Sequence, residues 1–278
     1  MTMIKVNQDR HGKPVELYYE DVGSGTPVVL IHGWPVSQQM WENQILALAS
    51  KGFRVISYDR RGFGESSKSW DGYDYDTLAD DLQGLLTALD LTGVTLVGFS
   101  MGGGEIARYM SRHSGERISK VAFISAVTPF MLKTENNPDG VDKSTFDGMV
   151  EGITKDRPDF LKTFAKGFFG VSALHHSVSS AVLDWNQSLA LRASLKATLD
   201  CVRSFSETDF RDDLKKISVP TLIVHGKSDK TVPFEASGEL TAALIPSATL
   251  KAYDGAPHGL YITHKDQLNQ DLLAFLGA

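Results

Sequence analysis

The sequence predicts an α/β fold, in which a mostly parallel sheet carries helices on both faces and a helical insertion caps one edge. Two observations support this class. Short runs of β-forming residues alternate with segments of helical periodicity, which is typical of parallel strands joined by helical crossovers. The central runs, such as Pro27–Gly33, are almost continuously apolar, as expected for strands that are covered on both faces.

The elements follow one another at spacings typical of such a sheet. A leucine stripe over residues 78–89 has the period of an amphipathic helix. Two further helices are expected at Met40–Ser50 and Met101–His113, each followed by a glycine that ends it. Strands are expected at Val15–Gly23, Pro27–Gly33, Phe53–Asp59, Val94–Ser100, Lys120–Val127, Thr221–Gly226 and Ala248–Ala256.

The alternation stops between about Pro129 and Leu214 and resumes at Val219. The intervening stretch lacks strong strand signals and contains aromatic-rich helical pieces such as Phe160–Gly170. We therefore expect residues 1–128 and 215–278 to form the core domain and residues 129–214 to form a helical cap over the carboxyl edge of the sheet.

Composition limits the classes of partner. The 278 residues carry a formal charge of −6 and no basic cluster, which argues against a nucleic-acid partner. No run of about 18 apolar residues occurs, so no membrane span is expected. The polar first residues predict no signal peptide. Cys201 is the only cysteine, which excludes an internal disulfide and fits a cytoplasmic location.

Ser100 is the candidate nucleophile. It lies between Gly98 and Gly102, after an apolar strand and before a helix. A sharp strand-to-helix turn would lift its hydroxyl to the edge of the sheet, and only small neighbours avoid clashes in such a turn. The pattern alone is also compatible with a glycine-rich turn that has no catalytic role.

A serine nucleophile needs a base, and the base needs an orienting acid. In this architecture the acid and then the histidine follow the serine along the chain. Asp229 and His258 have this order, and each follows a strand. Other acids and histidines fit less well by position: Asp254, His225, His264, His175 and His176.

An oxyanion hole needs two main-chain N–H groups. Met101, at the start of a helix, is one candidate donor. The stretch "IHGWPVS" follows the strand from Pro27 and offers Trp34 as the second, because Pro35 has no N–H. We expect His32 and Gly33 to shape the turn.

These stretches resemble the α/β-hydrolase superfamily and, within it, the cofactor-free (non-haem) haloperoxidase group, which includes aryl esterases, perhydrolases and γ-lactamases. The resemblance spreads over nearly the whole chain, and "SYDRRGFGESS" together with "GFSMGGGE" is specific to this group. It implies an eight-stranded sheet and a Ser100–Asp229–His258 triad. It also implies a cap with an aromatic-lined acyl pocket, for which Phe99, Phe130 and Pro35 are the candidate lining residues.

The resemblance implies that small carboxylic esters are cleaved through an acyl-enzyme, and that a peracid forms from a carboxylic acid or ester and hydrogen peroxide. Such proteins use no cofactor or metal ion, and the sequence offers no convincing metal-binding cluster. Proline after the tryptophan accompanies the perhydrolase-like members. The resemblance also implies a homo-oligomer, whereas the residues themselves leave the oligomeric state open.

The sequence is also compatible with other functions. The same triad could cleave a γ-lactam or a carbon–carbon bond, whereas a haloalkane dehalogenase would need an acid at position 100. A binding module without catalysis could also retain this fold and its pocket. Labelling of Ser100 by an organophosphonate would separate an enzyme from such a module.

Overall fold

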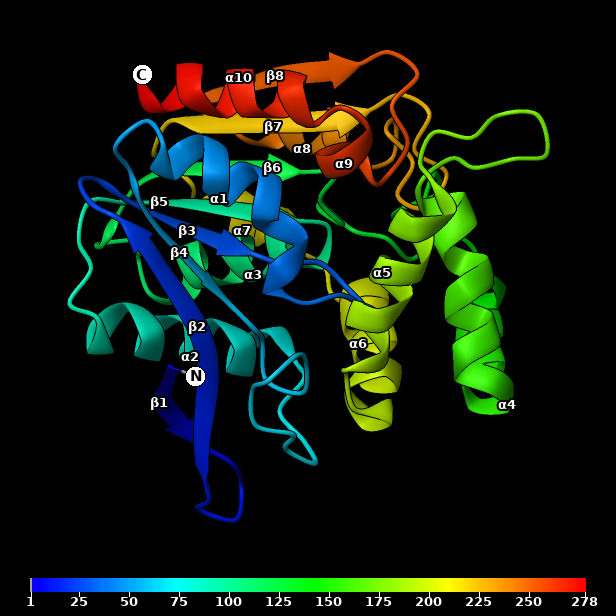
Figure 1. The fold of residues 1–278 in the computed structure, drawn as a ribbon, viewed down its shortest axis with the longest axis horizontal. Coiled ribbons are helices and arrows are strands. Elements are labelled where there is room, and N and C mark those ends of the chain that lie inside the picture. The colour runs from blue at the N-terminus through cyan, green and yellow to red at the C-terminus, as the bar shows by residue number, and fades with distance from the viewer. Residues whose placement is uncertain (1) are drawn as a thin grey trace.

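An eight-stranded sheet forms the centre of the computed structural model, which describes residues 2–278 (Figure 1). The strand order is β1-β2-β4-β3-β5-β6-β7-β8; β1 and β2 are antiparallel to their neighbours, and the others are parallel. The mostly parallel sheet is therefore confirmed. The strands are β1 (Met3–Gln8), β2 (Pro14–Gly23), β3 (Pro27–Ile31), β4 (Arg54–Tyr58), β5 (Val94–Phe99), β6 (Ile118–Ile124), β7 (Thr221–Gly226) and β8 (Ala248–Tyr253).

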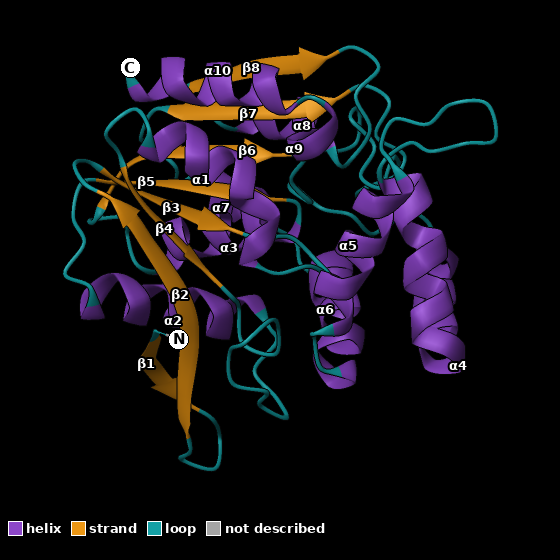
Figure 2. Cartoon of the chain, viewed as in Figure 1, coloured by secondary structure: helices purple, strands orange, loops and turns teal. Residues whose placement is uncertain are grey.

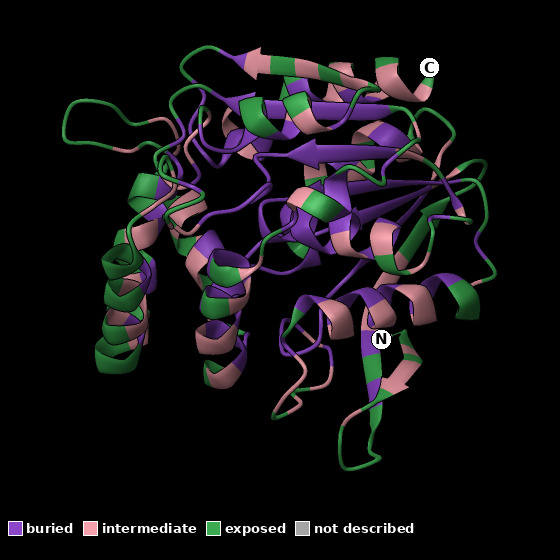
Figure 3. Cartoon of the chain, turned by 180° about the vertical axis from the view of Figure 1, so that it is seen from behind, coloured by how far each residue is buried: buried purple, intermediate pink, exposed green. Residues whose placement is uncertain are grey.

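Helices cover both faces of the sheet (Figure 2). Successive side chains of a strand point to opposite faces. Accordingly, Val28 and Leu30 belong to one hydrophobic cluster, while Val29 and Ile31 belong to another. The cluster of Val28 and Leu30 includes residues of α1 (Glu42–Ala49), α9 (Leu260–Thr263) and α10 (Lys265–Leu276). The cluster of Val29 and Ile31 includes residues of α2 (Tyr75–Ala88) and α3 (Met101–Arg112). The central strands are buried throughout (Figure 3).

Some elements differ from the prediction. The strand β1 was not expected, because its alternating residues are only partly buried and its sequence, MIKVNQ, is half polar. The helices α8 (Gly238–Leu244), α9 and α10 were also not predicted. The helix expected at Met40–Ser50 begins as a 3-10 turn at Gln38–Trp41 and becomes α-helical at Glu42.

The chain between β6 and β7, called the cap segment below, contains α4 (Lys143–Phe168), α5 (Ser180–Leu191), α6 (Leu195–Glu207) and α7 (Arg211–Leu214). The helices α4, α5 and α6 stand beside the edge toward which the arrowheads of β5, β6 and β7 point (Figure 1). Asp156 interrupts α4 with a non-helical backbone two residues before Pro158, whose ring has no N–H to donate. Among residues 2–278, no helix is long and apolar enough to cross a bilayer.

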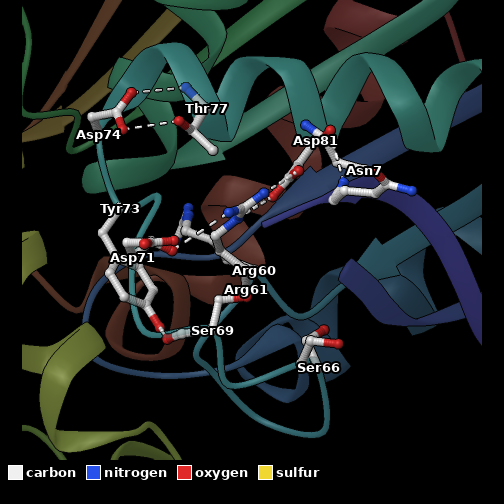
Figure 4. Close-up of polar contacts among 12 residues, drawn as sticks. Asn7, Arg60, Arg61, Ser66, Ser69, Asp71, Tyr73, Asp74, Thr77 and Asp81 are labelled. Atoms are coloured by element: carbon white, nitrogen blue, oxygen red, sulfur yellow. Dashed lines mark hydrogen bonds and ion pairs between the residues drawn. The ribbon is translucent and has the colours of Figure 1, made fainter. Parts of the chain in front are cut away.

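A buried ion pair fastens the loop after β4 to α2 (Figure 4). The guanidinium of Arg61 donates to both carboxylate oxygens of Asp81, at 2.5 and 2.6 Å. Both side chains are almost fully buried. Nearby, Asp74 begins α2 by accepting a hydrogen bond from the N–H of Thr77. The loop that contains Arg60 and Arg61 is therefore fixed against the helix layer.

We expect Asp81→Ala to lower the free energy of unfolding by about 3–5 kcal/mol, because it leaves the guanidinium of Arg61 buried without its partner. Urea denaturation followed by circular dichroism measures the change. Asp147→Ala is the matched control, since Asp147 pairs with Lys143 on an exposed helix face. Equal unfolding midpoints for the two variants would contradict the expectation.

Candidate active site

Ser100 forms the turn between β5 and α3. Its backbone has φ 53° and ψ −115°, a region that residues with side chains rarely adopt. The turn depends on close backbone contacts: a Cβ at Gly98 would lie 2.5 Å from the carbonyl oxygen of Gly102, and a Cβ at Gly102 would lie 2.6 Å from that of Ile31. The glycines on both sides therefore permit the turn that presents the Ser100 hydroxyl.

The structure brings Ser100, His258 and Asp229 together. The Nε2 atom of His258 lies 3.0 Å from the Oγ of Ser100. Its Nδ1 atom lies 2.6 Å from the Oδ2 of Asp229. All three residues are buried, with Ser100 6% exposed. This is the geometry in which an imidazole can take a hydroxyl proton while a carboxylate orients its ring.

The carboxylate of Asp229 is held from several sides. Its Oδ1 accepts hydrogen bonds from the N–H groups of Thr231 and Val232, and its Oδ2 faces His225 as well as His258. Burial would raise the pKa of Asp229, but the charge of His258 and the hydrogen bonds from both imidazoles outweigh it and hold that pKa below its ordinary value. Asp229 is therefore ionised, which favours Nδ1 of His258 as the protonated nitrogen.

The contact between His225 and Asp229 was not foreseen from the sequence. His225 is fully buried, and its Nε2 also lies 2.9 Å from the carbonyl oxygen of Val232. The spacing of four residues between His225 and Asp229 gave no signal, because a loop rather than a helix connects them.

Two phenylalanines support the imidazole of His258. The ring of Phe99 lies 4.9 Å and that of Phe168 lies 4.8 Å from it, measured between centroids. Phe99 was expected in the pocket wall, but it is fully buried behind the base and also packs against Trp41. The residue beside the serine points into the core because side chains alternate along β5.

Trp34 and Met101 hold the two N–H groups expected in an oxyanion hole. Neither N–H donates a hydrogen bond to another group within residues 2–278. The Met101 N–H begins α3, where the helix dipole favours negative charge. The indole N–H of Trp34 donates to the carbonyl oxygen of Thr198 at 3.0 Å, so this residue also joins the loop after β3 to the cap segment.

A buried ion pair lies beneath this loop. The guanidinium of Arg60 donates to Glu105 of α3 at 2.7 Å and to the carbonyl oxygen of His32 at 2.8 Å. Glu105 also accepts from the hydroxyl of Tyr58. Burial and the charge of Arg60 lower the pKa of His32, which is therefore a neutral structural residue. The sequence "RRGFGESS" gave no signal that Arg60 would link the two sides of the site.

A cavity of about 320 Å³ opens over the Ser100 hydroxyl. Its wall is largely apolar and comes mainly from the cap segment. Pro35 and Phe130, both expected there, do not line it; Phe130 instead packs against the guanidinium of Arg211. The lining residues are Trp34, Ser100, Val127, Met131, Val141, Thr145, Phe146, Met149, Phe160, Thr163, Phe164, Gly167, Phe168, Phe205, Lys230, Thr231, Val232 and His258.

The remaining candidate acids and histidines lie outside this cavity. Asp254 pairs with Lys227 at 2.7 Å, whereas His175 and His264 line a separate hollow. Within the described part of the chain, no group of three or more histidine, cysteine or acidic side chains is placed to hold a metal ion.

The fold and this arrangement of serine, histidine and aspartate define the class of protein. The profile of the alpha/beta hydrolase fold family matches residues 26–265. The chain belongs to that family, and it is an enzyme of the hydrolase class.

Individual relatives indicate which members of the alpha/beta hydrolase fold family this chain is similar to. A putative non-heme chloroperoxidase of Synechocystis is 47% identical, over 99% of this chain and 100% of its own. The bifunctional esterase/perhydrolase DCH of Acinetobacter calcoaceticus is 42% identical, over 94% and 96%. The crystal structure of a bromoperoxidase from Bacillus anthracis superposes with a TM-score of 0.94 at 51% identity, over 100% and 99%. The chain is thus similar to the non-heme haloperoxidases and their esterase relatives.

We expect Gly102→Ala to lower the free energy of unfolding by about 1–3 kcal/mol, because its Cβ would overlap the carbonyl oxygen of Ile31, a backbone atom that cannot turn away. Gly148→Ala is the matched control. Gly148 lies on the exposed side of α4 with open space around it, and alanine there should raise stability by about 0.5–1 kcal/mol. Denaturant titrations that gave both changes the same sign would contradict this.

Proposed function

We propose that the protein is a serine esterase that also catalyses perhydrolysis, with Ser100 as nucleophile, His258 as general base and acid, and Asp229 as the orienting carboxylate. The proposal rests chiefly on one observation: the Ser100 hydroxyl lies 3.0 Å from the imidazole of His258 at the floor of an apolar cavity. The name of the esterase/perhydrolase relative supports the pairing of the two activities.

In the first half-reaction, the Oγ of Ser100 attacks the ester carbonyl carbon while its proton moves to Nε2 of His258. The resulting oxyanion accepts hydrogen bonds from the N–H groups of Trp34 and Met101. The bond to the alcohol oxygen then breaks, and that oxygen takes the proton from Nε2. An acyl ester on Ser100 remains and the alcohol leaves.

In the second half-reaction, water or hydrogen peroxide attacks the acyl carbon and gives its proton to Nε2 of His258. Collapse of the second tetrahedral intermediate breaks the bond to Oγ, which takes the proton back. Water yields the carboxylic acid, whereas hydrogen peroxide yields the peracid. When a carboxylic acid rather than an ester acylates Ser100, the leaving group is water.

The shape of the cavity supports small acyl groups. Its volume of about 320 Å³ and its wall of phenylalanine, methionine and valine side chains favour a compact apolar acyl chain over a charged one. Burial of such a chain contributes about 0.8 kcal/mol for each methylene removed from water.

We expect Ser100→Ala to lower kcat for p-nitrophenyl acetate by about 10⁴-fold or more and to abolish labelling by an organophosphonate, because no other hydroxyl within residues 2–278 forms a hydrogen bond with His258. Ester hydrolysis and mass spectrometry of the labelled protein measure the two effects. Ser206→Ala, a buried serine on α6 outside the cavity, is the control and should keep wild-type values. Wild-type activity in Ser100→Ala, or a folded wild type that resists labelling, would refute the proposal.

A second prediction concerns the choice between water and peroxide. Proline restricts the backbone of the residue before it, and so bears on the direction of the Trp34 carbonyl, which could accept a hydrogen bond from peroxide. We expect Pro35→Leu to lower the ratio of perhydrolysis to hydrolysis, measured with acetate plus hydrogen peroxide and with p-nitrophenyl acetate. An unchanged ratio would show that Pro35 does not influence the choice between water and hydrogen peroxide.

The same panel of assays tests the alternative amide substrate. A bicyclic γ-lactam is run beside the short-chain esters on the wild type and on Ser100→Ala. Turnover of the lactam faster than of every ester would make lactam cleavage, rather than ester cleavage, the main activity of the triad.

A further inference from the structure

Among the described residues that line the active-site cavity, Lys230 is the only lysine, arginine, aspartate or glutamate. It directly follows the acid of the triad, Asp229, and its side chain is exposed. Its ammonium group makes no ion pair or hydrogen bond with any side chain in residues 2–278. The cation of Lys230 beside this largely apolar cavity is therefore available to a ligand.

The position of Lys230 is fixed by the catalytic geometry. The turn at residues 229–232 is held by the two N–H groups that donate to Oδ1 of Asp229 and by the contact between His225 and the Val232 carbonyl oxygen. The Cα atoms of adjacent residues are about 3.8 Å apart, so the backbone of Lys230 cannot move far without moving Asp229.

A second hollow adjoins the active-site cavity at Lys230. The two share the lining residues Gly167 and Lys230. Figure 1 shows the loop between α4 and α5 at the same edge of the molecule as the loops that follow β7 and β8. Most of the residues that line the hollow belong to these three loops. Its other lining residues are Phe169, Gly170, Val171, Ser172, His175, Ser177, Ser228, Gly255, Pro257, Thr263 and His264.

The chemistry of the second hollow differs from that of the acyl cavity. It contains hydroxyl and imidazole groups, and none of its described lining residues is an aspartate or glutamate. Asp254, the acid next to Gly255, is already paired with Lys227 at 2.7 Å. The hydroxyls of Ser177 and Thr263 already donate to carbonyl oxygens of the chain. Within residues 2–278, the hollow therefore presents the cation of Lys230 and the hydroxyls of Ser172 and Ser228, which is chemistry that recognises a carboxylate.

The location of the hollow relates it to the leaving group. Pro257 and Gly255 precede His258, whose Nε2 must deliver a proton to the departing alcohol oxygen in the proposed mechanism. The acyl chain, by contrast, would bind in the largely apolar cavity to which α4 and α6 contribute. Ser100 and His258 line only the acyl cavity, which meets the hollow at Gly167 and Lys230, so an alcohol part that extends past these two residues enters the hollow.

We propose that this hollow is a subsite for the alcohol part of the substrate, and that Lys230 makes the enzyme prefer esters in which the hydroxyl group of a hydroxy acid is acylated. The alcohol that leaves from such an ester carries a carboxylate. The inference rests on the proposed esterase function. Since the chain as a whole has a charge of −6, Lys230 supplies the local positive charge that an anionic substrate needs at this opening.

The test compares two pairs of substrates. The first pair, 4-acetoxybutanoate and butyl acetate, differs in a carboxylate on the alcohol part. The second pair, monoethyl glutarate and ethyl pentanoate, differs in a carboxylate on the acyl part. The kcat/KM ratio of charged to neutral ester is measured for each pair on the wild type, Lys230→Gln, Lys230→Glu and Lys230→Arg.

We expect Lys230→Gln to lower the ratio for the alcohol pair by about fivefold, mainly through KM, because an exposed ion pair contributes up to about a factor of five to binding. Lys230→Glu should lower this ratio further, and Lys230→Arg should restore it. In 0.5 M sodium chloride the wild-type ratio should fall toward that of Lys230→Gln, since salt screens exposed charges. Lys51→Gln, which removes an exposed lysine that lines neither hollow, is the matched control and should leave the ratio unchanged.

An unchanged ratio for the alcohol pair in Lys230→Gln would overturn the inference. An equal or larger change in the acyl pair would overturn the assignment of the hollow to the alcohol part. These failures remain distinct from failure of the proposed function, because that failure would appear as a wild type that hydrolyses neither butyl acetate nor ethyl pentanoate.

Discussion

The strained turn at Ser100 is the constraint on which the site depends. A non-glycine residue with φ of 53° persists only when its surroundings hold it, and here the surroundings are backbone atoms. The carbonyl oxygens of Ile31 and Gly102 leave no room for side chains at Gly102 and Gly98. The same close approach brings the start of α3 against the end of β3. The candidate nucleophile and both candidate oxyanion donors therefore derive from one packed corner of the sheet.

Buried charges surround this corner, and each has a partner. Asp229 faces two imidazoles and two N–H groups, while Arg60 joins Glu105 on one side to the His32 carbonyl on the other. Such pairs contribute little net stability compared with apolar packing, but loss of one partner is costly. Their effect here is positional: the contacts of Arg60 fix the loops after β3 and β4 with respect to α3, and the contacts of Asp229 hold the loop after β7 against His258. A site with fixed dipoles needs little reorganisation when charge develops on a substrate.

The sequence predicted the parallel strands and the meeting of residues 100, 229 and 258, because apolar runs and chain order determine which loops share the carboxyl edge of such a sheet. The resemblance implied an aromatic-lined pocket under the cap, but the residues named for its wall were wrong. Phe99 lies behind the base because strand alternation turns it inward, and Phe130 packs under Arg211. The wall comes from α4 and α6, whose positions depend on tertiary contacts rather than local periodicity. The edge strand β1 was missed because half-polar residues suffice where one side faces solvent.

Trp34 has two attachments that belong to different parts of the molecule. Its main chain lies in the loop beside Ser100. Its indole contacts the helices α4 and α6 over the cavity, through the Thr198 carbonyl and the rings of Phe164 and Phe205. Entry of a bulky ligand that pushes those helices outward must therefore also pull on the loop that would stabilise the transition state. Trp34 thereby couples the packing of a ligand in the cavity to the position of a candidate oxyanion donor. A ligand that fits the cavity poorly would lose both binding energy and transition-state stabilisation.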